Sequence, residues 1–181
     1  MTFGPGAGVD PMVLLHNAAG VLLQHAAIRG MGFDRTVIGG LDTAIGRGGN
    51  FGTLTRIHPF LFYAVVPPGL AQRGSLQAYS RDAVDYAVRH KGGLPRGMQS
   101  GSVAVHVVVT DRMAPGSERW ARKPRGSRFA AIGYPVVVSL ADRTVTHPKH
   151  FVLGAAYARP LRRLVRENVT DVLFPGEGRR R

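Results

Sequence analysis

The stretch that decides the fold is SVAVHVVVT, residues 102 to 110. Five of its nine residues are valine, and this nearly continuous apolar run predicts a strand buried on both faces, as in the interior of a parallel sheet. A second run, residues 53 to 66, alternates at first and then becomes continuously apolar as FLFYAVV. It predicts another strand, in which Pro59 marks an edge or a bulge.

The clearest amphipathic helix lies between these two strands, at residues 76 to 91. Arg81, Asp85 and Arg89 recur one turn apart on one side, and Gly92 and Gly93 supply a stop signal. The predicted buried face carries Leu76, Tyr79, Ala83, Ala87 and His90. Strand, helix and strand in this order predict a right-handed βαβ crossover.

The sequence also predicts an N-terminal helix over Pro11–Ile28. Asp10 can cap its free amides, Pro11 suits the first helical position, and Gly30 follows its end. The polar side is a narrow arc of His16, Asn17, Gly20 and Gln24, and we expect the apolar remainder to be largely buried. The alternative is a membrane-surface anchor, although the polar side lacks Lys and Arg. Neither a signal peptide nor a membrane span is expected here.

The remaining segments complete an α+β domain, with a mixed α/β arrangement as the alternative. We expect a short strand at 36 to 41, a conformational loop at the glycine-rich 46 to 52, and strands at 129 to 140 and 144 to 147 joined as a hairpin. A last, basic helix is expected from 159 or 160 to 169. The predicted architecture is a single domain over residues 1 to 174, with a central mixed sheet, the N-terminal helix, one βαβ crossover and the basic C-terminal helix. Residues 175 to 181 are expected to form a mobile basic tail.

Composition points to an anionic partner. The chain has 181 residues, 24 Lys and Arg against 11 Asp and Glu, and a net charge of +13. Residues 1 to 118 carry ten cations and seven acids, whereas residues 119 to 181 carry fourteen and four, so +3 and +10 make up the total. Such a regional surplus attracts nucleic acid, anionic lipid or an acidic partner. The absence of cysteine excludes disulfides, thiolate nucleophiles and Cys-based zinc sites, and leaves a cytoplasmic location as the expectation.

The densest basic segment is residues 119 to 128, with five cations and one indole in ten residues. We expect an exposed loop that binds nucleic acid or another polyanion, DNA included, without strong sequence preference. Trp120 either stacks on an unpaired base or anchors the loop. The expected binding residues, including three from the C-terminal helix, are Arg119, Trp120, Arg122, Lys123, Arg125, Arg128, Arg162, Arg163 and Arg166. The plain alternative is a solvated charge run that keeps the protein soluble.

Two other functions are carried as alternatives to this non-enzymatic binding. One is a structural or assembly subunit, possible as a homo-oligomer, that grips an acidic protein or an anionic membrane surface. The other is a hydrolytic enzyme built on Asp111 with His106 or His58, which requires these groups to converge in one pocket. No catalytic residue is assigned, so the balance leans against an enzyme.

No cofactor and no metal site is expected. The glycine-rich loop at 46 to 52 precedes a strand-like run, whereas phosphate loops precede a helix. His147 and His150 have a spacing typical of metal sites, but Pro148 and Lys149 lie between them and no acidic or thiol ligand is near in sequence.

The order helix, strands, helix, strand is similar to the core of restriction-endonuclease-like nucleases. That family places an Asp and a Glu-x-Lys pair on adjacent strands to hold Mg²⁺ and activate water. Residues 53 to 66 contain neither an acid nor a lysine. The resemblance therefore covers element order alone, and no residue or activity is transferred.

Overall fold

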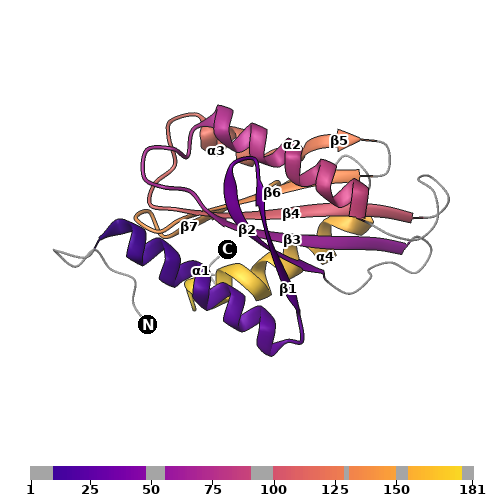
Figure 1. Ribbon diagram of the computed structural model, residues 1–181, viewed down its shortest axis with the longest axis horizontal. Helices are drawn as coiled ribbons and strands as arrows, with labels where there is room; N and C mark the ends of the chain where they lie inside the picture. Colours follow the sequence, from indigo (N-terminus) through magenta and orange to yellow (C-terminus); the bar gives the residue numbers. More distant parts are fainter. Residues whose placement is uncertain (1–9, 48–55, 91–99, 129–130, 150–154, 177–181) are drawn as a thin grey trace.

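The computed structural model describes residues 10 to 47, 56 to 90, 100 to 128, 131 to 149 and 155 to 176. Seven strands form one mixed sheet in the order β1-β2-β3-β4-β6-β5, with β7 also paired to β6. Helices cover both faces of this sheet (Figure 1). The predicted single α+β domain with a central mixed sheet is confirmed.

The N-terminal helix α1 spans Pro11–Ile28, as predicted. The Asp10 carboxylate accepts a hydrogen bond from the Met12 amide at 2.8 Å, which confirms the predicted cap. Its buried residues are Leu15, Ala18, Ala19, Leu22 and Ala26, and α1 lies against β3 and β4. Among the described helices, α1 alone is long and apolar enough to cross a membrane by length and composition.

A tight hairpin follows α1 and corrects the sequence prediction. Strands β1 (Phe33–Ile38) and β2 (Leu41–Arg47) are antiparallel, and Gly39 and Gly40 form the turn with φ of +54° and +80°. Two residues with positive φ match the right-handed twist of a two-residue hairpin. The predicted single strand at 36 to 41 is therefore wrong, because the turn divides it. The predicted loop at 46 to 52 is also partly wrong: residues 46 and 47 belong to β2, and the rest lies outside the described residues.

Three parallel strands form the centre of the sheet: β3 (Arg56–Val65), β4 (Ser100–Thr110) and β6 (Ala131–Ser139). Helix α2 (Arg73–His90) connects β3 to β4, which confirms the predicted βαβ crossover. The connection from β4 to β6 is a second parallel crossover that the sequence analysis missed.

That second connection contains the basic segment. Helix α3 spans Ser117–Ala121, and the edge strand β5 spans Arg125–Arg128 and pairs with β6. The predicted exposed loop over 119 to 128 is therefore wrong. Burial of Trp120, which is 2% exposed, fixes α3 against the sheet.

Two prolines lie inside central strands, each at a place where one neighbour is missing. Pro59 pairs with Val103 of β4, while β2 pairs with β3 only from Phe60 onward. Pro135 pairs with His106 of β4, while β5 and β7 pair with β6 on either side of it. A proline lacks the amide that a second neighbour would require, so these positions tolerate it.

The last described elements lie on the face that α1 covers. Strand β7 (Thr144–Thr146) forms the predicted hairpin with β6. Helix α4 (Ala155–Val165) continues through a π-helical turn, Arg166–Thr170, into the short α5 (Asp171–Leu173). The predicted basic helix is thus confirmed and extends beyond both predicted ends. Most of the predicted tail, residues 177 to 181, lies outside the described residues.

The sheet separates two apolar cores. The side chains of α1, α4 and α5 pack on one side of β4, and those of α2 and α3 pack on the other. We name these sides the α1–α4 face and the α2–α3 face. Figure 1 shows α2 and α3 above the sheet and α1 and α4 below it.

Candidate functional site

The loops that follow β3 and β4 meet at the carboxyl ends of these parallel strands. The Ala114 amide donates to the Ala71 carbonyl at 3.4 Å, and the buried Ser117 hydroxyl donates to the same oxygen at 3.0 Å. These bonds hold the segment directly before α2 beside α3. Sites in α/β proteins form at this edge of a sheet, because the loops there can vary without disturbing the strands.

A pocket of about 440 Å³ opens between the two helices. We call it the basic pocket. Among the described residues its lining contains three cations and no carboxylate, and these lining residues are Arg73, Pro115, Gly116, Arg119, Trp120 and Lys123. Arg73 is the first residue of α2, whereas Arg119 and Lys123 come from α3 and the residues directly after it.

The three cations of the basic pocket have no ion pair or hydrogen bond within the described part of the chain. Arg122 differs, since its guanidinium pairs with the Glu118 carboxylate one turn earlier. Three like charges around one hollow raise the local positive potential and favour an anion there. The first turn of α2 has no acidic residue, so the positive end of its dipole is not offset.

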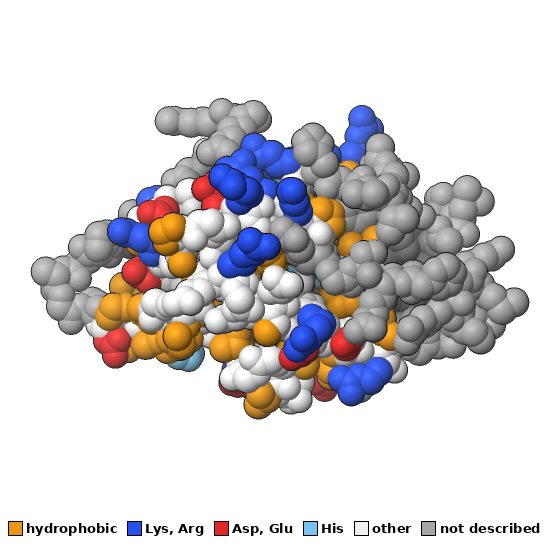
Figure 2. Space-filling view, turned by 90° about the horizontal axis from the view of Figure 1, so that it is seen from above, with side chains coloured by type: hydrophobic (Ala, Val, Ile, Leu, Met, Phe, Trp, Pro, Cys, Tyr) orange, Lys and Arg blue, Asp and Glu red, His pale blue; other side chains and the backbone are white. Residues whose placement is uncertain are grey.

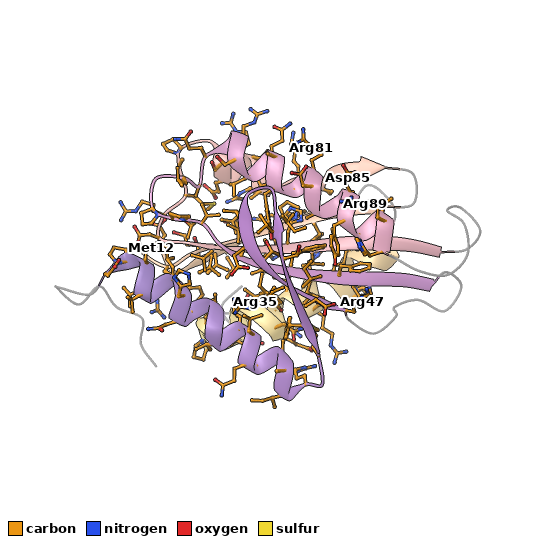
Figure 3. All side chains as sticks on the ribbon, in the orientation of Figure 1. Met12, Arg35, Arg47, Arg81, Asp85 and Arg89 are labelled. Carbon is orange, nitrogen blue, oxygen red and sulfur yellow. The ribbon has the colours of Figure 1, made fainter. Side chains whose placement is uncertain are left out.

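The outer surface of α2 extends this basic region away from the pocket. Figure 3 shows Arg81, Asp85 and Arg89 along this helix. Arg81 pairs with Asp82 at 3.1 Å, and the Arg89 side chain donates to the Asp85 carbonyl at 3.3 Å. Seen from above, this face carries several basic side chains and fewer acidic ones (Figure 2). The extension therefore has mixed charge, and the unpaired cations are concentrated at the pocket.

Trp120 does not present its ring to a ligand as a stacking platform. Its side chain is buried with Ala121 in the core beneath α2. Of the two predicted roles, stacking on a base or anchoring the segment, the structure supports anchoring. Arg125 and Arg128 lie on β5, which is next to α2, but their side chains are outside the described part.

The C-terminal arginines lie elsewhere. Arg162, Arg163 and Arg166 belong to α4 and the π-helical turn, on the α1–α4 face. The expectation that they extend the surface of residues 119 to 128 is wrong, because the sheet separates the two groups. Arg163 pairs with Glu167 at 2.6 Å, and Arg166 pairs with Asp171 at 3.9 Å.

Arg73 is the pocket residue that the sequence analysis missed. It lies 46 positions before Arg119, so no local charge pattern connects the two. The topology does contain a signal. Segments that follow two adjacent parallel strands come together at one sheet edge, and both Arg73 and Arg119 follow such strands.

The proposed convergence of Asp111 with His106 is not found. His106 lies beneath α2, with its ring 6.1 Å from that of Tyr79, and burial lowers its pKa to about 4. Asp111 follows five residues later, directly after the end of β4, at a distance along the strand of roughly 16 Å. Its carbonyl accepts from the Ser139 hydroxyl at 3.0 Å, which is a structural bond at the end of β6. The side chain of His58 lies outside the described part.

No cluster of three metal-ligating side chains occurs among the described residues. His147 directs Nδ1 toward the Tyr134 hydroxyl and the Pro148 carbonyl, at 3.1 and 3.2 Å. His150 lies outside the described residues.

Comparison of the chain with protein-family models, with curated proteins and with solved structures finds no match. The interpretation of the site therefore rests on its own geometry and charge.

Proposed function

We propose that the protein binds a polyanion, with nucleic acid as the primary candidate, through the basic pocket and the adjoining surface of α2 and α3. The observation that carries this proposal is the set of three cations around one pocket, which within the described residues have no ion pair and meet no carboxylate in the pocket lining. Guanidinium and ammonium groups neutralise phosphates and release condensed counterions, which makes binding strong at low salt. Stacking of a base on Trp120 is not part of the proposal, since the indole is buried.

Two triple variants with the same net charge test this proposal. The first replaces Arg73, Arg119 and Lys123 with Gln and empties the pocket of cations. The matched control replaces Arg159, Arg163 and Arg166, which are exposed cations of the opposite face, with Gln. Both variants lower the charge from +13 to +10, so any difference between them reports position and not total charge.

The measurement is fluorescence anisotropy of a labelled single-stranded oligonucleotide between 50 and 200 mM salt. The pocket variant should reduce the slope of log K against log salt by about 2, because each lost contact on a single strand contributes roughly 0.7. The control should keep the wild-type slope. Equal losses in both variants would assign binding to net charge alone and would reject the pocket.

A competition arm separates polymer classes. Duplex DNA and polyglutamate of equal charge compete with the labelled strand. Displacement by duplex DNA at lower concentration supports nucleic acid as the partner. Stronger displacement by polyglutamate would instead favour an acidic protein partner, which is the assembly alternative.

A further inference from the structure

Aromatic side chains reach the surface at the carboxyl end of α2, away from the basic pocket. His90 is the last residue of this 18-residue helix, whereas the pocket residue Arg73 is its first. At 1.5 Å per residue, the two positions are roughly 26 Å apart along the helix axis. A group bound at His90 therefore occupies a different part of the surface from a group bound in the pocket.

Three rings in contact lead from the core to this surface. Phe62 of β3 is fully buried and meets the Tyr86 ring in a T-shaped contact, with centroids 5.8 Å apart and planes at 89°. The half-buried Tyr86 ring stacks in turn on the imidazole of His90, with centroids 3.9 Å apart and planes at 16°. The sequence analysis placed His90 on the buried side of its helix. That prediction is wrong, because His90 is exposed.

The imidazole of His90 is held in one orientation. Its Nδ1 lies 2.9 Å from the Tyr86 carbonyl one turn earlier, and because a carbonyl only accepts, Nδ1 donates this hydrogen bond. The Tyr86 ring covers the inner face of the imidazole, and the outer face has no ring partner within the described residues. A side chain that is already fixed loses little rotamer freedom when a ligand binds. The outer face of His90 is thus a flat, ordered and exposed aromatic surface.

Charge alone gives this part of α2 little attraction for a polyanion. Residues 81 to 89 contain two arginines and two aspartates, so +2 and −2 cancel. Arg81 pairs with Asp82, and the Arg89 side chain donates to the Asp85 carbonyl (Figure 3). An unpaired nucleobase offers another interaction, because its flat ring stacks on aromatic side chains, histidine included, whatever the identity of the base.

We propose that His90 and Tyr86 form a stacking platform for one unpaired nucleobase of a single-stranded nucleic acid. The base lies on the outer face of His90, and Tyr86 is a positioning residue that holds the imidazole. This inference rests on the proposed binding of nucleic acid, and it adds a preference for single strands. A base in a duplex would first have to leave its own stack, which costs free energy.

Two labelled strands of equal length test the stacking platform. One carries thymine at every position, and the other is an abasic sugar–phosphate strand with the same number of phosphates. Fluorescence anisotropy at fixed salt gives the affinity of the intact protein for each strand. His90→Ala should weaken binding of the thymine strand by at least about fivefold, the lower limit for the stacking of one base, and should leave the abasic strand unaffected.

His16 provides a matched control on the other face of the sheet. It is an exposed histidine of α1 whose Nδ1 lies 2.8 Å from the Met12 carbonyl one turn earlier, but it has no ring contact within the described residues. His16→Ala should therefore leave both affinities unchanged. His90→Phe should bind the thymine strand as the wild type does, since it keeps a flat ring at this position without the charge or the hydrogen bond of an imidazole.

The outcomes separate this inference from the proposed function. If the wild type binds neither strand at 50 mM salt, both are rejected. If the triple variant of the basic pocket weakens binding of both strands while His90→Ala changes neither affinity, the stacking platform alone is rejected. Equal losses in His90→Ala and His16→Ala, or a loss with the abasic strand as large as with the thymine strand, would also overturn it.

Discussion

The two faces of β4 are packed by different kinds of residue. Toward α1 and α4 the strand presents only valines, Val103, Val105, Val107 and Val109. Toward α2 it presents the apolar Ala104 and Val108 together with buried polar side chains, which are Ser102, His106 and Thr110. The covering helices differ in the same way, because α1 contains no Asp, Glu, Lys or Arg, and α2 contains five.

The two faces of the sheet therefore differ in role: one contributes apolar packing, and the other also carries the basic pocket. The valine face maximises apolar burial, which contributes roughly 25 cal/mol for each Å² removed from water. The α2–α3 face gives up part of that gain, since polar atoms of His106, Ser102 and Thr110 are buried there without a hydrogen-bond partner in the described structure. It is also the face whose helices carry the basic pocket. The comparison predicts that stability depends on packing on both sides, whereas polyanion binding belongs to the α2–α3 face.

The largest expected effect concerns the indole that fixes α3. Trp120→Ala should lower the free energy of unfolding by about 3–5 kcal/mol, because it removes a fully packed aromatic side chain and leaves a cavity. Urea unfolding followed by circular dichroism measures this. Leu161→Ala, on the other face, should cost about 2–5 kcal/mol. A loss below about 1 kcal/mol for Trp120→Ala would show that α3 does not depend on this contact.

The second effect is a pH dependence of the free energy of unfolding, which arises from His106 beneath α2. Burial lowers the pKa of His106 from 6.5 to about 4, so the unfolded chain binds one more proton than the native protein between these values. The stability that neutral His106 contributes is fully present above pH 6.5. It should fall by about 3 kcal/mol as the pH falls toward 4. Urea unfolding at several pH values should show this loss in the wild type and a smaller one in His106→Leu. Equal slopes in the two proteins would assign the effect to other groups.

The third effect concerns the hairpin turn that touches α2. A Cβ at Gly39 would lie 2.9 Å from the Tyr79 Cα and would also require a positive φ, so Gly39→Ala should cost about 2 kcal/mol. At Gly40 the φ is +80° but nothing lies within 4 Å, so Gly40→Ala should cost only about 1 kcal/mol. Thermal unfolding of this matched pair separates backbone strain from contact with α2. Equal costs would mean that the contact adds nothing.

The smallest effect lies on the opposite face and has the opposite sign. Gly20 is in the middle of α1, and a Cβ there meets nothing within 4 Å. Gly20→Ala should therefore stabilise the protein by up to about 1 kcal/mol, through helix propensity alone. A lower melting temperature for this variant would contradict this expectation.

The sequence was sufficient for elements whose signals are local. The Asp10 cap and Pro11 located the start of α1, and the valine run of β4 indicated a strand with two buried faces. The turn at Gly39 and Gly40 is not evident from hydrophobic pattern alone, because apolar and β-branched residues continue on both sides of the two glycines. Charge density alone predicts a loop at residues 119 to 128, whereas the burial of Trp120 requires ordered structure around it.

The candidate site was only half predictable. Arg119 and Lys123 stand out as charge, and their exposure follows from their type. Their partner Arg73 depends on strand order, because only the pairing of β3 with β4 brings the start of α2 next to α3. The position of Arg162 is also not predictable from the sequence. The face of the sheet on which a helix packs depends on tertiary structure, and a count of charges along the chain does not indicate it.

The proline in β6 has a consequence for contacts between molecules. The outer side of β6 is covered by two short strands with Pro135 between them, and the far edge of the sheet is the six-residue β1, which carries Asp34 and Arg35. A foreign strand approaching either border would find no long run of free amides and carbonyls to copy, and intermolecular β-pairing of the kind that starts aggregates has no template there. The described sheet of this valine-rich chain is therefore protected against strand pairing between molecules.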